Sequence, residues 1–266
     1  MSVIGVTTAN GRALCRVVLF LVLCPIVLAV TSALTDKIAG LSQTLVLAAV
    51  ASLCTFALTI LFVRWEKLRL DDVGAAPRPS SLHRFALGFV GGLLLVALVN
   101  SLAFAAGHVR WVGASTDIAA TVMMLITFLA LSCREELAFH GYPLRQLERL
   151  VGLWSSQVII ALAFAIEHRM GGMPWTRALL GPVAGSLLFG MAAIATRGLA
   201  VPIGLHAAWN FGDWMLGWKE WPGMWQVVVE KGQEQRVELA RTLSFLAVVG
   251  ATTLAFWVWH RRKDRA

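Results

Sequence analysis

The sequence predicts an all-α fold, a polytopic membrane bundle of about eight transmembrane helices. Hydrophobic residues make up 58% of the 266-residue chain and charged residues only 14%, whereas a soluble domain carries about 25% charged residues. The apolar residues also fall into runs of the ~20 residues that a helix needs to cross a bilayer. These runs leave no room for a large extramembrane domain, so we expect residues 1–266 to form a single integral membrane domain.

The expected helices follow the apolar runs along the chain. The first run is long for a cleavable signal and further spans follow it, so we expect it to be retained as a helix. The third contains Gly88, Gly91 and Gly92, which predicts close packing against another helix. The predicted spans are residues 17–34, 43–63, 85–106, 118–141, 152–170, 178–196, 199–217 and 240–259.

The charges predict both the class of protein and its orientation. The net charge is +8, but the basic residues lie at the ends of apolar runs, which indicates contact with a lipid bilayer and no nucleic acid. The composition excludes a soluble enzyme, a disordered chain and a nucleic-acid-binding module. The basic stretch from Arg64 to Arg84 is placed in the cytoplasm by the positive-inside rule, and counting spans from it places both termini there as well.

Three groups of polar residues interrupt the apolar helices, where ionisable side chains are expensive and usually functional. They are the Glu135–Glu136 pair, His168 at the end of the fifth span, and His206 with Asn210 in the seventh. Adjacent carboxylates on a helix point ~100° apart, so we expect one to face the bundle interior and the other to find its own partner.

These side chains suit hydrolysis. A glutamate and a histidine from different helices can hold and deprotonate a water molecule. His206 and Asn210 are four residues apart and share a helix face, so both can donate hydrogen bonds to one oxygen. The residues therefore indicate a base, an orienting histidine and an oxyanion-stabilising pair.

The same motifs, in this order on separate helices, resemble the CPBP family of CAAX proteases and bacteriocin-processing enzymes, also called the Abi family. The family includes the Ras-converting type of CAAX endoprotease. The resemblance covers about residues 118–217, the expected catalytic core, and weakly the stretch Leu70 to Gly74. It implies an intramembrane endopeptidase that cleaves a membrane-associated peptide or protein substrate, and we expect it in the bacterial inner membrane.

The resemblance also implies roles for individual residues. Glu135 corresponds to the general base, and His168 to the histidine that orients the water. His206 and Asn210 correspond to the pair that stabilises the oxyanion. The family gives the second glutamate, Glu136, a lesser role, so we include it in the site while leaving open whether it is structural or catalytic.

One position departs from the family pattern, because His140 stands where the family has an arginine. His140 could pair with Glu136 across one turn, or Arg145, beyond Pro143, could supply the missing charge. Arg134 or Arg145 could instead pair with Glu136 directly. We expect Glu167 to be solvated near its helix end.

Several alternatives remain open at this point. Two histidines and a glutamate also suit zinc, so the site could act without a cofactor or hold a divalent metal, with no metal ligands assigned. Two other functions are open. The protein could be a non-enzymatic scaffold or regulator of the same fold, or it could be a transporter built on the buried Glu and His residues. Glu135 and His168 reach the same depth only if the fourth helix continues past Pro143, and the side on which the cavity opens is undecided.

Overall fold

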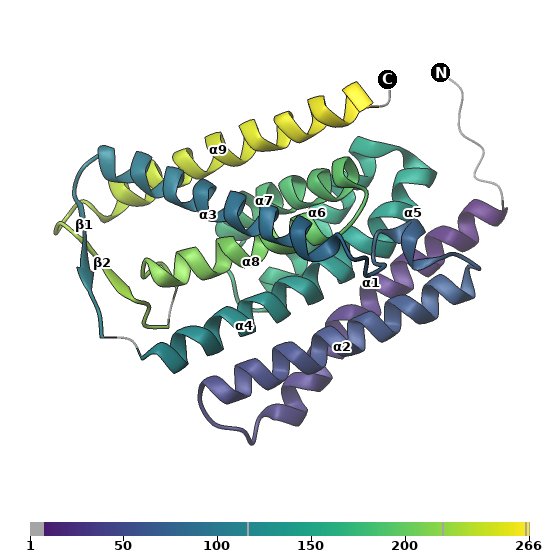
Figure 1. Cartoon of the computed structure of the whole chain (residues 1–266), viewed down its shortest axis with the longest axis horizontal. Coiled ribbons are helices and arrows are strands. Elements are labelled where there is room, and N and C mark those ends of the chain that lie inside the picture. Colours follow the sequence, from purple (N-terminus) through teal and green to yellow (C-terminus); the bar gives the residue numbers. More distant parts are fainter. Residues whose placement is uncertain (1–7, 116, 220, 264, 266) are drawn as a thin grey trace.

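Long helices built from the apolar runs form a bundle, and one short antiparallel pair of strands lies at one end of it (Figure 1). The computed structural model describes residues 8–115, 117–219, 221–263 and 265. The elements are α1 Thr8–Thr35, α2 Leu41–Trp65, η1 Leu70–Val73, α3 Ser81–Ala105, β1 Val109–Gly113, α4 Ile118–Glu135, η2 Glu136–Gly141, α5 Tyr142–Val151, α6 Leu153–Met170, α7 Trp175–Thr196, α8 Ala200–Met215, β2 Trp225–Val229 and α9 Glu234–Lys263. Every predicted span falls on one of these helices, so the predicted all-α membrane bundle is confirmed.

Among the described residues, six helical stretches are long and apolar enough to cross a membrane. They are Asn10–Thr35, Leu41–Trp65, Ser81–Ala105, Ile118–Val151, Trp175–Thr196 and Glu234–Lys263. The predicted spans at α6 and α8 are not among them. The 16 residues of α8 rise about 24 Å, which is less than the ~30 Å hydrocarbon thickness. The middle of α8 is instead buried among its neighbours, from Leu205 to Ala208, and this is where His206 lies.

The fourth span is continuous from α4 through η2 into α5, as the depth argument required. η2 is a π-helical turn, and such turns are frequent at functional sites. The backbone leaves helical geometry at Gly141 (φ −82°, ψ −115°), and Pro143 then falls in the first turn of α5. Proline is tolerated there because its missing N–H would have no helical partner. Glu135 and Glu136 lie at the junction of α4 and η2.

The glycines of α3 allow the close helix contact that the sequence predicts. A Cβ on Gly88 would lie 2.2 Å from the Val201 carbonyl oxygen, and one on Gly92 would lie 2.7 Å from the Ala208 Cβ. Gly204 of α8 faces α3 in the same way, because its Cβ would lie 2.3 Å from the Phe85 carbonyl oxygen. The backbone of α3 thus lies directly against the helix that carries His206 and Asn210, which fixes the position of that helix.

The short segment η1 is tied to the junction between α7 and α8. Gly74 has a left-handed backbone (φ 70°), and its carbonyl accepts a hydrogen bond of 3.1 Å from the Leu199 N–H. A Cβ on Gly74 would lie 3.0 Å from the Gly198 Cα. The Leu70–Gly74 stretch therefore holds the start of α8 in place.

Candidate active site

The two adjacent glutamates lie in different surroundings. The Glu136 side chain is fully buried, whereas 17% of the Glu135 side chain is exposed. Since the two glutamates are adjacent on one helical stretch, the difference in their exposure comes from the directions in which their side chains point. The expectation that one carboxylate faces the interior therefore holds, and the interior one is Glu136.

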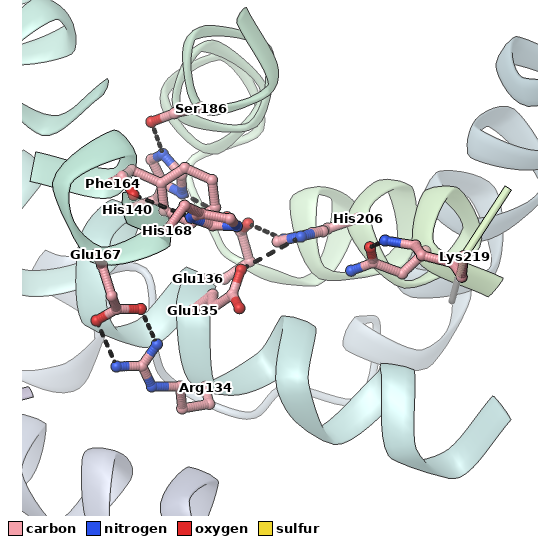
Figure 2. Close-up of polar contacts among 11 residues, drawn as sticks. Arg134, Glu135, Glu136, His140, Phe164, Glu167, His168, Ser186, His206 and Lys219 are labelled. Atoms are coloured by element: carbon pink, nitrogen blue, oxygen red, sulfur yellow. Dashed lines mark hydrogen bonds and ion pairs between the residues drawn. The ribbon is translucent and has the colours of Figure 1, made fainter. Parts of the chain in front are cut away.

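Glu136 joins two histidines inside the bundle (Figure 2). Its Oε2 lies 2.8 Å from the His140 Nδ1, and its Oε1 lies 2.9 Å from the His206 Nδ1. The other ring nitrogen of His140 lies 3.0 Å from the Ser186 Oγ. Of the two alternatives for the missing arginine, His140 and Arg145, the structure therefore contains the pairing of His140 with Glu136.

His206 connects the two glutamates. Its Nδ1 bonds to Glu136, and its Nε2 faces the Oε2 of Glu135 at 3.4 Å. That separation is longer than a normal N–H···O hydrogen bond. The Phe189 ring stacks on the imidazole with 4.4 Å between centroids and an interplanar angle of 15°. Packing on one face and the bond to Glu136 fix the orientation of the ring, so that Nε2 is directed at Glu135.

His168 lies beside Phe164, whose ring also lies near His206. Its Nδ1 is 2.9 Å from the Phe164 carbonyl oxygen. A carbonyl can only accept, so Nδ1 carries the hydrogen and Nε2 is the lone-pair nitrogen of the neutral ring. The Phe164 ring centroid is 4.4 Å from that of His168 and 6.1 Å from that of His206. One aromatic ring therefore contacts both candidate histidines.

Asn210 is oriented by a residue that the sequence analysis did not select. The Lys219 Nζ donates a hydrogen bond of 2.9 Å to the Asn210 Oδ1. The same ammonium lies 5.9 Å from the centroid of the Phe128 ring. With its oxygen occupied by Lys219, the Asn210 amide has its N–H groups left to donate elsewhere. Lys219 lies in the loop after α8, and no spacing rule of helices or strands relates it to Asn210.

The basic residues of the motif have other partners than expected. The Arg134 guanidinium is buried and binds both carboxylate oxygens of Glu167, one of them at 2.6 Å. Arg145 bonds to the Ala193 carbonyl oxygen at 2.7 Å and to Glu148. Neither arginine pairs with Glu136, because Arg134 is directed toward α6 and Arg145 toward α7. The expectation that Glu167 is simply solvated is wrong, since a buried charge requires a paired partner.

The comparisons with known proteins cover this region. Residues 116–212 match the family model described as Type II CAAX prenyl endopeptidase Rce1-like. The predicted family resemblance is confirmed. No curated protein and no solved structure matches the chain.

The segment similar to this Rce1-like family begins just before α4 and includes most of α8. It therefore contains both glutamates, His168, His206 and Asn210. Together with the long apolar helices, the match makes the chain an integral, multi-pass membrane protein. By its description, that family consists of CAAX prenyl endopeptidases.

The placement of the donor side chains bears on whether the site can hold a metal. Zinc in a catalytic site takes three protein ligands at about 2.0–2.3 Å. Among residues 8–115, 117–219, 221–263 and 265, no three His, Cys, Asp or Glu side chains come together as such a set. The donor side chains, as they are placed, do not form such a ligand set.

Proposed function

We propose that the protein is an intramembrane endopeptidase of the CAAX-protease type that hydrolyses a peptide bond through a water activated by Glu135 and His168. The observation that carries this proposal is the arrangement around His206. One of its nitrogens is bonded to the buried Glu136, while the other faces the partly exposed Glu135. One carboxylate thus orients the imidazole, and the other is available for chemistry.

In the first step, Glu135 removes a proton from water, and the water oxygen attacks the peptide carbonyl carbon. The Nε2 of His168 accepts the other hydrogen of the same water, because its Nδ1–H is already donated to the Phe164 carbonyl. His168 thus orients the nucleophile without taking its proton. The proton stays on Glu135 until it is transferred to the leaving amine.

In the second step, negative charge develops on the former carbonyl oxygen. The His206 Nδ1 bonds to Glu136, and its Nε2, when it carries a hydrogen, can donate to this oxygen. Asn210 donates from its amide, whose oxygen is held by Lys219. The C–N bond then breaks, and Glu135 gives its proton to the departing amine. Atoms and charges balance, and Glu135 returns to its ionised form.

The substrate class follows from the location of the site. A site on membrane helices is reached by peptides held at the membrane, such as a prenylated or otherwise anchored C-terminus. The family match over residues 116–212 supports a CAAX-type substrate in particular.

The test uses the purified protein in lipid vesicles with a fluorogenic peptide that carries a prenylated cysteine. Glu135→Ala and His206→Ala should each abolish cleavage while the proteins still elute as folded, monodisperse species. Glu230→Ala is the matched control, because Glu230 is an exposed carboxylate that pairs with His108 away from the site. Cleavage that survives in both site variants would overturn the mechanism, and a wild-type protein without cleavage would favour a scaffold.

A further inference from the structure

Two adjoining cavities open at the end of the bundle opposite the β1–β2 pair, and they share a basic lining. The first measures about 340 Å³ and the second about 350 Å³. Four cations line the second cavity, and we call them the basic mouth: Arg78, Arg84, Arg197 and Lys263. Asp71 is the acidic residue among those that line the two cavities. The mouth is therefore strongly cationic.

Three of these cations lie where membrane spans end. Arg84 is in the first turn of α3, Arg197 directly follows α7, and Lys263 is the last residue of α9. All three helices are candidate membrane spans. The ends of such helices lie at the level of the lipid headgroups, where anionic lipids attract Lys and Arg. The basic mouth is thus at the depth of lipid phosphates.

The same three cations keep their charge available. Arg78 is neutralised by Asp71, to which its Nε and Nη2 bond at 3.0 and 2.5 Å, and this pairing lowers the pKa of Asp71. Arg84 donates to the neutral Thr196 carbonyl at 3.2 Å. In the described part of the chain, neither Arg84, Arg197 nor Lys263 forms an ion pair with a carboxylate. An anion that enters the mouth therefore meets three cations that have no carboxylate partner among the described residues.

The backbone at Arg197 gives independent support. Arg197 has left-handed angles (φ 53°, ψ 39°) at the C-terminal end of α7. Glycine is the usual residue in this position of a helix end, because it has no Cβ to strain. An arginine kept in a strained conformation beside a cavity suggests that its side chain serves a function there.

The first cavity supplies an apolar space next to the mouth. Its walls include Leu53 and Phe56 of α2, Leu137 of η2, and Val201 and Ile203 of α8. A cationic mouth at headgroup depth that continues into an apolar cavity has the two properties of a phospholipid binding site. We propose that the basic mouth binds the phosphate of an anionic membrane lipid, and that one acyl chain of this lipid lies in the adjoining apolar cavity.

The test measures binding of short-chain phosphatidylglycerol to the full-length protein in detergent, beside phosphatidylcholine and inorganic phosphate. Phosphatidylglycerol should bind more tightly than either of the other two. Arg197→Gln and Arg84→Gln should each weaken its binding about fivefold, and the double variant about 25-fold, as expected for loss of one and two surface cations. Arg149→Gln is the matched control, because Arg149 is exposed on α5 and does not line either cavity.

Each other outcome contradicts the proposal. Equal binding of phosphatidylcholine and phosphatidylglycerol would show that the net negative charge of the lipid does not contribute to binding. Inorganic phosphate that binds as tightly as the lipid would assign the mouth to free phosphate instead. Unchanged lipid binding in Arg197→Gln would also overturn the proposal, and this exposed single variant decides the matter if the double variant does not fold.

Discussion

Glutamine substitutions at Glu135 and Glu136, made separately, should separate chemistry from folding in the candidate active site. Both changes replace a carboxylate by a carboxamide of the same shape. Glu136 is fully buried and bonded to His140 and His206, whereas Glu135 is partly exposed and has His206 at 3.4 Å. We therefore expect Glu136→Gln to destabilise the protein and Glu135→Gln to leave its stability nearly unchanged.

The magnitudes follow from the contacts. A hydrogen bond to a charged group contributes about 1.5–3 kcal/mol and a neutral one about 0.5–1.5 kcal/mol. Replacing the two charged bonds of Glu136 by neutral ones should thus lower the free energy of unfolding by about 2–3 kcal/mol. For Glu135 the change should stay below about 0.5 kcal/mol, because its 3.4 Å separation from the His206 Nε2 is too long for a normal hydrogen bond. Cleavage should fall about 10²–10⁴-fold in Glu135→Gln, which lacks the general base.

Thermal unfolding followed by tryptophan fluorescence measures the first quantity, because the chain contains 11 Trp residues. Cleavage of the prenylated peptide in vesicles measures the second. Glu230→Gln controls for the loss of one carboxylate. The reasoning fails if Glu136→Gln melts at the wild-type temperature, or if Glu135→Gln loses as much stability as Glu136→Gln.

Four further changes test other parts of the structure. Asn210→Ala should lower kcat about 10²–10³-fold with KM nearly unchanged, because it removes one oxyanion donor; an equal rise in KM would contradict this role. Arg134→Met should destabilise the protein by about 3–5 kcal/mol by leaving Glu167 buried and unpaired, whereas Arg134→Met with Glu167→Met should recover most of that loss; thermal unfolding of both variants measures it. Arg197→Gly should raise the unfolding temperature, since a left-handed backbone costs a non-glycine residue about 1–2 kcal/mol. The ion pair of Asp71 lowers its pKa, so its stabilising effect is present above about pH 4 and is lost as the pH falls below that; Asp71→Asn and wild type should differ in melting temperature at pH 6 and converge only as the pH falls through the lowered pKa of Asp71.

Hydropathy was sufficient to predict the helices, because a helix in lipid must satisfy its own backbone and so follows an apolar run. It could not predict that α8 is too short to span, since the apolar run of α8 continues beyond Met215 into the loop that contains Lys219. The pairing of β1 with β2 was also beyond the sequence. Val109 pairs with Val229, and no local pattern connects two short strands on either side of the helices that carry the site.

The site was predictable where its geometry is local. The i, i+4 spacing of Glu136 and His140 made their contact one of the open alternatives, and the structure contains it at 2.8 Å. Long-range partners were not predictable in the same way. Arg134 and Glu167 are 33 residues apart, and the choice of Glu167 over Glu136 depends on the direction in which Arg134 leaves α4. Sequence spacing carries no information on that direction once the partner lies on another helix.

The surroundings of His140 bear on how its difference from the family arginine is interpreted. An arginine at this position would carry a longer side chain into a fully buried space, where even a Cβ added to Gly190 would lie 3.1 Å from the His140 Cδ2. The Ser186 hydroxyl meets the second nitrogen of the imidazole, so both polar atoms of the ring have partners. The surroundings are therefore shaped for histidine, and a buried polar network that is fully satisfied at this position rigidifies its members. Because His140 holds Glu136, and Glu136 holds His206, the departure preserves the orientation of the residue that faces Glu135. It consequently gives no support to a non-enzymatic scaffold over an endopeptidase.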